Sequence, residues 1–172
     1  MNAESKLIVM RGHSGSGKSS VAKAIQEQAE KPLVILSHDL FRIAPFKSLK
    51  DRSLANELSA EMVVDCASML LERGFDVIIE GIFYFPKYKS YFDKLFAKHP
   101  SNNSVFMFDI DFDETLKRHQ TRSKVTDFGV EEMKEWHQEL QPSGYDFEKT
   151  ITNDSTLEET VQFICKIAGI KV

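Results

Sequence analysis

The sequence has few of the residues that mark disulfide-rich, metal-bound or modular proteins. Its two cysteines, Cys66 and Cys165, form no C-x-x-C pair, which predicts free buried thiols. The five histidines show no metal-site spacing such as H-x-x-x-H. Proline and glycine form no repeat, low-complexity segment or linker, so we expect one domain that spans residues 1–172.

Long apolar runs and an excess of basic charge are missing as well. The apolar stretch after residues 1–6 is too short for a signal-peptide core or a membrane span, so we expect a cytoplasmic protein with no membrane partner. The net charge of -4 and the pI near 5.8 argue against binding nucleic acid mainly through bulk charge. They do not exclude binding through a local basic groove.

One glycine-rich motif organises the chain. Residues 12–19 read G-H-S-G-S-G-K-S and fit the phosphate-binding pattern G-x-x-x-x-G-K-[ST], between an apolar run and a helix. Glycine allows positive φ and close approach to a ligand, so successive N–H groups can surround an anion at the open helix end. We predict that a nucleotide's phosphates contact Gly12, His13, Ser14, Gly15, Ser16, Gly17, Lys18, Ser19 and Ser20.

Two residues of this motif have separate roles in the prediction. Lys18 would reach the β- and γ-phosphates as a mobile point charge, and the Ser19 hydroxyl would hold Mg²⁺. Asp39 or Glu80 would assist that metal through water. The alternative is a Gly/Ser-rich turn without a ligand, but a plain turn requires neither the final glycine nor the Lys-Ser pair.

Short apolar runs alternate with amphipathic segments, as in a βαβ protein. Strands are expected at 7–10, 33–36, 77–79, 105–108 and 149–152, and helices at 18–30, 53–73, 86–98, 113–122, 130–139 and 156–168. In the helix at 53–73 the apolar positions near helical spacing are Leu54, Leu58, Met62, Cys66, Met69 and Leu70. This pattern indicates an α/β fold whose parallel sheet is covered on both faces.

Ligands of such sheets bind beyond the carboxyl ends of the strands. The polar residues that follow the strands should therefore converge on one crevice. They are the glycine loop, Asp39, Glu80, Asp109 and Asp111.

Three groups of residues could serve an acceptor at this edge. Asp39 could accept a proton from an attacking hydroxyl, and Arg42, one turn later, could bind an anionic part of the acceptor. A helix N-cap with a solvated arginine is the alternative. Glu80 ends a strand and could contact the acceptor or the metal's water shell, and Tyr84 could line an acceptor pocket, although the aromatic residues around it are mostly expected in the core.

Arg118 and Arg122 stand four residues apart on a predicted helix and so share one face. With Lys117 and Lys124 they form a local basic cluster in an acidic chain. Phosphoryl transfer needs positive charge where the transferred oxygens gain negative charge, and arginines on a closing lid can supply it. A solvated helix face is the alternative interpretation.

A resemblance to a known family rests on motifs along nearly the whole chain. They are the loop at 12–19, the D-x-x-R pair Asp39 and Arg42, the strand-end Glu80 and Gly81, the R-x-x-x-R spacing of Arg118 and Arg122, and residues 152–155 before the last helix. On these motifs the chain resembles the P-loop kinases that phosphorylate small molecules or nucleic-acid ends. That group includes the polynucleotide 5′-hydroxyl kinase domain, chloramphenicol phosphotransferase, adenylylsulfate and gluconate kinases, and the zeta toxins.

The resemblance implies a three-layer αβα P-loop NTPase fold with a five-stranded parallel sheet of order 2-3-1-4-5. It implies ATP on the loop, Mg²⁺ as cofactor, a helical lid near 113–128, and an acceptor site between the lid and the helices after strands two and three. Asp39 would be the general base, Arg42 a substrate-binding residue, and residues 153–156 would lie near adenine. The sequence departs from the family in having Glu80 for a strand-end Asp, and Asn153-Asp154 where relatives often carry Asp-Thr.

The leading functional hypothesis is an ATP- and Mg²⁺-dependent kinase that transfers the γ-phosphate to a hydroxyl of a small molecule. Lys18, Asp39, Arg118 and Arg122 would be its catalytic residues, and Asp39, Arg42, Glu80 and Tyr84 would bind the acceptor. Two alternatives stay open: a kinase of nucleic-acid 5′ ends or nucleotides, and an acceptor-independent ATPase. A GTPase switch is not favoured, because the chain has neither a D-x-x-G nor an N-K-x-D sequence.

Overall fold

A computed structural model of the chain describes residues 5–85, 87–120, 130–137 and 139–172. Its centre is a parallel sheet of five strands in the order β2-β3-β1-β4-β5, which confirms the predicted α/β fold and strand order. The strands are β1 (Leu7–Gly12), β2 (Leu33–Ser37), β3 (Asp76–Gly81), β4 (Asn103–Phe108) and β5 (Glu148–Ile151). The register pairs Glu80 with Met10 on one side and with Ser37 on the other, so the ends of these three strands lie together.

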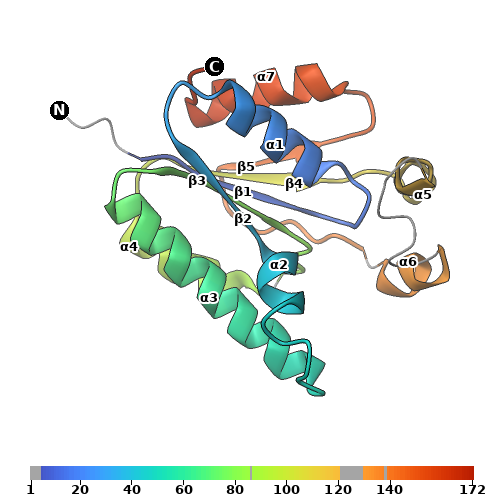
Figure 1. The fold of residues 1–172 in the computed structure, drawn as a ribbon. Coiled ribbons are helices and arrows are strands. Elements are labelled where there is room, and N and C mark those ends of the chain that lie inside the picture. The colour runs from blue at the N-terminus through green and yellow to red at the C-terminus, as the bar shows by residue number, and fades with distance from the viewer. Residues whose placement is uncertain (1–4, 86, 121–129, 138) are drawn as a thin grey trace.

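Helices cover both faces of the sheet (Figure 1). One face carries α1 (Lys18–Gln28) and α7 (Leu157–Ala168), and the other carries α3 (Arg52–Glu72) and α4 (Lys89–Lys98). Three shorter helices lie toward the carboxyl ends of the strands: α2 (His38–Ile43), α5 (Phe112–Gln120) and α6 (Val130–Trp136). The sequence pattern did not predict α2 as a helix. No helix among the described ranges has the length and apolar character needed to cross a bilayer.

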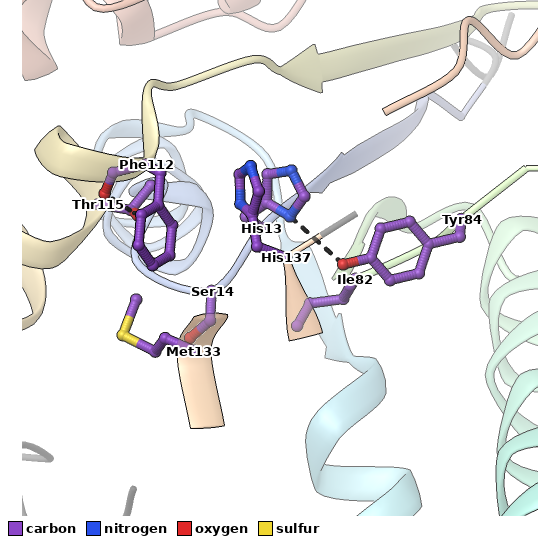
Figure 2. Close-up of a pocket in the computed structure, with 8 residues that line it drawn as sticks. All are labelled: His13, Ser14, Ile82, Tyr84, Phe112, Thr115, Met133 and His137. Atoms are coloured by element: carbon purple, nitrogen blue, oxygen red, sulfur yellow. Dashed lines mark hydrogen bonds between the residues drawn. The ribbon is translucent and has the colours of Figure 1, made fainter. Parts of the chain in front are cut away.

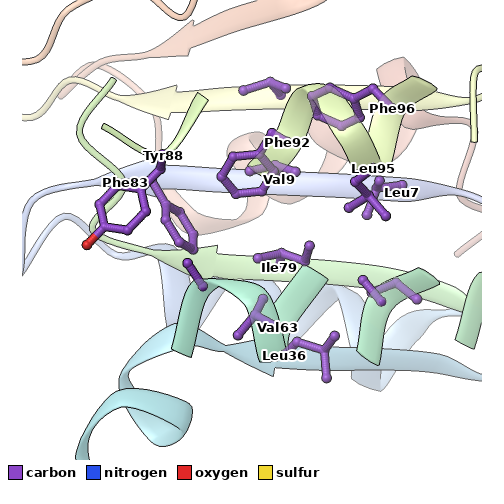
Figure 3. Close-up of a cluster of buried hydrophobic side chains, with 14 of the residues drawn as sticks. Leu7, Val9, Leu36, Val63, Ile79, Phe83, Tyr88, Phe92, Leu95 and Phe96 are labelled. Atoms are coloured by element: carbon purple, nitrogen blue, oxygen red, sulfur yellow. The ribbon is translucent and has the colours of Figure 1, made fainter. Parts of the chain in front are cut away.

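Two cores flank the sheet because successive side chains of each strand point to opposite faces. Leu7 and Val9 of β1 pack toward α3 and α4, whereas Ile8 and Met10 pack toward α1 and α7. The first core is rich in phenylalanine, and Phe83, Phe92 and Phe96 pack on this face of the central strands (Figure 3). Complete burial of side chains of this size contributes about 1.5–3 kcal/mol each, so the two cores fix the sheet that presents the loop.

The helix α3 buries a different face from the one expected. Leu54, Leu58, Met62 and Met69 are exposed, and small residues face inward instead. The buried residues are Ala55, Ser59, Ala60, Val63, Ala67, Ser68 and Leu71. Small side chains let the helix backbone approach the sheet closely, which the long leucine and methionine side chains would prevent. The prediction of the buried face was wrong for the four exposed residues, whereas Cys66 and Leu70 of the predicted set pack half-buried against the core.

Several predicted boundaries shift by a few residues. The helix α4 begins at Lys89 rather than at residue 86, and Tyr88 just before it is buried in the phenylalanine-rich core. At the start of α7, Thr156 accepts from the Glu159 backbone N–H while the Glu159 carboxylate accepts from the Thr156 backbone N–H, and this reciprocal cap fixes the helix start. Both cysteines are free thiols, but only Cys165 is fully buried; Cys66 is half-buried.

Candidate active site

The glycine loop between β1 and α1 has the backbone that an anion site requires. Gly15 and Gly17 have φ of 84° and 98°, where a side chain would be strained. A Cβ on Gly15 would also lie 2.7 Å from the Thr115 carbonyl oxygen of α5. Because α1 begins at Gly17 without a side-chain cap and without an acidic residue in its first turn, its N-terminal N–H groups are open to a phosphate.

The Lys18 side chain lies buried across this loop. Its ammonium donates to the carbonyl oxygens of Gly12 and His13 at 2.8 and 2.7 Å, and to the Ser16 hydroxyl at 3.1 Å. These oxygens hold a positive charge inside the loop. That position fits the predicted role of Lys18 toward phosphate oxygens.

The oxygen atoms of Ser19 and Glu80 meet beside the loop. The Ser19 hydroxyl donates to the Glu80 carboxylate at 3.2 Å, so the two predicted metal-associated residues are neighbours. No group of three or more His, Cys, Asp or Glu side chains in the described ranges could hold a metal ion. Mg²⁺ suits a site of this kind, because it binds through one or two oxygen ligands and keeps several waters. The residues present therefore fit a magnesium ion bound together with nucleotide phosphates.

Asp39 and Arg42 form an ion pair on α2. The Arg42 guanidinium lies 3.1 Å from the Asp39 carboxylate, and the Asp39 side chain is 50% exposed. Asp39 follows Ser37 of β2 by two residues, and Ser37 is the register partner of Glu80. The predicted base and its arginine thus stand at the strand end next to the Ser19–Glu80 pair, where an acceptor can reach them.

The neighbouring His38 anchors α2 to the protein. Ser59 donates its hydroxyl proton to the Asn56 carbonyl oxygen, so the ring Nε2–H of His38 donates to Ser59 at 2.8 Å. The ring packs 4.9 Å from that of Phe83. Burial lowers the pKa of His38 to about 4, although the nearby Asp39 carboxylate acts to raise that pKa. His38 is therefore neutral in the folded protein near pH 7 and fixes the start of the helix that carries Asp39.

The depressed pKa of His38 predicts loss of stability in mild acid. The unfolded chain takes up the proton near pH 6.5, whereas the folded protein resists it until about pH 4. Between these two pH values the unfolded state holds more protons than the folded state. The free energy of unfolding therefore decreases as the pH is lowered, by on the order of 2 kcal/mol. Urea unfolding at pH 7.5 and 5.0 measures this loss. His38→Gln should reduce this pH dependence without abolishing it, because the pKa of buried His13 is also lowered to about 4. An unchanged slope would contradict the assignment.

Arg118 on α5 also contacts the glycine loop. Its guanidinium donates to the Ser16 carbonyl oxygen at 3.3 Å and to the Glu114 carboxylate at 2.8 Å. The predicted lid at 113–128 is described only as far as residue 120. Arg122 and Lys124, the other members of the predicted basic cluster, lie outside the described residues.

Asp109 and Asp111, which were also predicted at the crevice, bond to residues at the end of β5 and just after it. The Asp111 backbone N–H donates to the Asn153 side chain at 3.1 Å, and the Asn153 amide donates to the Asp111 carboxylate. The Asp109 backbone N–H donates to the Ile151 carbonyl oxygen at 2.9 Å. These aspartates tie the end of β4 to the segment after β5, where residues 153–156 were expected near adenine.

A small pocket over the loop contains residues that sequence reasoning missed (Figure 2). Its lining consists of His13, Ser14, Ile82, Tyr84, Phe112, Thr115, Met133 and His137. The His13 and His137 rings lie 4.1 Å apart, and His13 Nδ1 shares a 3.3 Å hydrogen bond with the Tyr84 hydroxyl. Tyr84 was predicted here, but Phe112, Met133 and His137 carry no local motif, because tertiary folding alone brings α5 and α6 over the loop.

The His13 ring is uncharged at neutral pH. Burial lowers its pKa to about 4, with further lowering from the nearby His137 and Lys18. The protonated form would add a positive charge beside that of Lys18. His13 therefore gives the loop a neutral, hydrogen-bonding edge.

Comparison with known proteins now identifies the family. A family model described as an AAA domain, AAA_33, matches residues 7–142, which include the glycine loop, Asp39, Glu80 and Arg118. The chain belongs to the AAA_33 family. The predicted resemblance to P-loop kinases is thereby confirmed at the level of the family. No curated protein matches the sequence.

Solved structures share the fold of this AAA_33 chain. The APS kinase CysC of Mycobacterium tuberculosis, in complex with AMPPNP and APS, has a TM-score of 0.75 at 18% identity, with 96% of this chain and 98% of that chain covered. A gluconokinase from Sinorhizobium meliloti 1021 has a TM-score of 0.67 at 19% identity, with 96% and 93% covered. The Pnkp1/Rnl/Hen1 RNA repair complex has a TM-score of 0.58 at 22% identity, over 78% of this chain and 43% of that chain. At these identities the matches show a common fold.

Proposed function

We propose that the protein is an ATP- and Mg²⁺-dependent kinase that transfers the γ-phosphate to a hydroxyl of a small-molecule acceptor. The observation that carries this proposal is that two groups of residues, one suited to the phosphate donor and one to the acceptor, lie at the same edge of the sheet. A glycine loop with a buried lysine and the Ser19–Glu80 oxygen pair suits the donor, and the Asp39–Arg42 pair at the adjacent strand end suits the acceptor. The fold shared with the APS kinase and the gluconokinase supports the same assignment.

The residues suggest how the transfer would proceed. The Asp39 carboxylate accepts the proton of the acceptor hydroxyl as its oxygen attacks the γ-phosphorus. The bond from that phosphorus to the β–γ bridging oxygen breaks, and ADP leaves with the electron pair. Lys18 and Arg118 stabilise the charge that develops on the transferred oxygens. Ser19, with Glu80 through water, would hold Mg²⁺, which neutralises phosphate charge when bound.

Asp39→Asn tests the acceptor half of this proposal. The amide cannot accept the hydroxyl proton, so kcat for acceptor phosphorylation should fall about 10²–10⁴-fold, while the KM for ATP changes little. ADP release, measured with and without acceptor, reports both quantities. Asp65→Asn, on the outer face of α3, removes a carboxylate away from the site and should have no effect. Full acceptor phosphorylation by Asp39→Asn would remove Asp39 as the base.

A kinase of nucleic-acid 5′-hydroxyl ends is the second candidate. It is favoured by the fold match to an RNA repair complex and by Lys117 beside Arg118 on α5. Transfer of labelled phosphate to a short 5′-hydroxyl oligonucleotide at saturating ATP tests it, and absence of transfer rejects it. A rate of ATP hydrolysis that no acceptor changes would instead favour an acceptor-independent ATPase.

A further inference from the structure

The glycine loop is in direct contact with one face of α5 (Figure 1). A Cβ on Gly15 would lie 2.7 Å from the Thr115 carbonyl oxygen, and a Cβ on Gly17 would lie 3.5 Å from the Nη1 atom of Arg118. Gly17 is the residue just before α1. The Arg118 guanidinium therefore stands at the open helix end where the phosphates of the donor are expected.

Arg118 makes bonds of unequal strength with Glu114 and Ser16. Its Nε–H donates to the Glu114 carboxylate at 2.8 Å, whereas its Nη1 group donates to the Ser16 carbonyl oxygen at 3.3 Å. The bond to Glu114 is shorter and joins opposite charges, so it is the stronger of the two. The hydrogen bond from Arg118 is also the main reason that the pKa of Glu114 is lowered, and Glu114 is therefore ionised near neutral pH.

The place of Glu114 on α5 suits a residue that orients this arginine. Glu114 stands four residues before Arg118, so the two side chains share one helix face in any position that α5 takes. An arginine side chain that is not held samples many rotamers. With the Nε–H bound to Glu114, the Nη1 group stays directed at the loop. A charged phosphate oxygen can replace the Ser16 carbonyl oxygen there, because it is the better acceptor.

We propose, resting on the kinase function proposed above, that Glu114 is a positioning residue for phosphoryl transfer, which holds Arg118 so that its Nη1 group points at the transferred phosphate oxygens. Glu114 acts through Arg118 and does not itself contact the nucleotide. The pair has little value for stability, because each side chain is 32% exposed and exposed ion pairs within one helix contribute little. Its value lies in aligning a charge before the reaction begins.

Removal of the Glu114 carboxylate should slow the chemical step. Glu114→Ala should lower kcat for phosphoryl transfer about tenfold while the KM for ATP changes less than about twofold, because alignment matters most in the transition state. Glu114→Gln keeps an oxygen acceptor and should recover most of that rate. Glu27→Ala is the matched control, since Glu27 pairs with Lys23 at the same spacing on the outer surface of α1, and should leave both constants unchanged. ADP release, with the best acceptor or with water, measures the rates.

A cycle of single and double substitutions tests whether Glu114 acts through Arg118. In the Arg118→Ala background, Glu114→Ala should have no further effect on kcat. A further loss there would show that Glu114 acts by another route and would overturn the proposal. An unchanged kcat in the single Glu114→Ala variant would also overturn it. So would a faster rate, because Glu114 would then restrain the arginine instead of aligning it.

An NMR measurement without turnover separates this proposal from the kinase function. The Arg118 Nε–H signal, assigned by its absence in Arg118→Ala, should be protected from exchange with water in the unsubstituted protein and in Glu114→Gln. It should lose that protection in Glu114→Ala while the backbone signals stay those of a folded protein. An unprotected signal in the unsubstituted protein would contradict the bond to Glu114.

The two measurements together distinguish the possible failures. Loss of protection in Glu114→Ala with an unchanged kcat would reject the positioning role and leave the kinase function standing. If the unsubstituted protein neither releases ADP nor phosphorylates any acceptor, the proposed function itself fails, and the positioning role fails with it.

Discussion

Lys18→Met should lower the rate of phosphoryl transfer about 10²–10³-fold, the loss expected when a positioned donor to the transition state is removed. Methionine matches the length of the lysine side chain but carries no charge. The Lys18 ammonium lies inside the loop against the carbonyl oxygens of Gly12 and His13, so its loss removes a positive charge from the loop itself. Initial rates of ADP release at saturating acceptor measure the effect.

A lysine elsewhere on the same helix provides the control. Lys23 is exposed and pairs with Glu27 across the outer surface of α1. Lys23→Met should leave the transfer rate unchanged. Thermal unfolding of both variants separates a catalytic loss from a folding defect. Transfer by Lys18→Met at the rate of the unsubstituted protein would show that the loop lysine does not act on the phosphates.

Glu148→Leu should lower the free energy of unfolding by about 3–5 kcal/mol, because it leaves a buried guanidinium without its counter-charge. Arg11 is the second-last residue of β1, next to the glycine loop, and its side chain is 0% exposed. Its Nε lies 2.7 Å from the Glu148 carboxylate, and its Nη2 donates to the Gln141 carbonyl oxygen at 2.7 Å. The guanidinium also lies 4.8 Å above the Phe85 ring. Equilibrium unfolding in urea measures the change.

A double substitution distinguishes the ion pair from loss of packing. Arg11→Met with Glu148→Leu removes both charges, and well-packed apolar replacements of buried ion pairs are often close to neutral. The double variant should therefore be markedly more stable than Glu148→Leu alone. A loss below about 1 kcal/mol for the single variant would mean that water or a rearranged side chain satisfies Arg11.

The ion pair of Arg11 and Glu148 also holds a segment of chain that leads away from the site. The segment around Gln141 and Ser143 returns from α6 to β5, and the Ser143 backbone N–H donates to the second oxygen of the Glu148 carboxylate at 2.7 Å. Arg11 and Glu148 together hold this segment against the sheet. Through it they position the chain that follows α6, which includes His137 of the small pocket over the loop.

Much of the donor side of the site could be predicted from sequence. Residues that act on phosphate in this motif are contiguous, because one turn of loop and one helix end must present their N–H groups to the same anion. Their spacing is therefore a local property, and the predictions for Lys18 and Ser19 rest on it. The predictions for Asp39 and Glu80 rest on a slightly longer inference, since parallel strands bring their carboxyl ends to one edge.

Other parts of the molecule could not be predicted in this way. The apolar residues of α3 at helical spacing were assigned to the wrong face, because periodicity does not reveal that the sheet requires small side chains at close range. Arg11 stands in a strand that reads as apolar, and nothing nearby in the sequence indicates its partner Glu148, which is far along the chain.

The sequence by itself determined the parallel α/β sheet and the phosphate loop, since alternating apolar segments and a contiguous glycine motif depend on local chain geometry. Only the tertiary structure decided which helix faces are buried, how Arg11 is paired, and which rings gather over the loop. Those features join residues that are distant in sequence. Their free energy comes from burial and charge pairing across the folded chain, and no local pattern encodes such contacts.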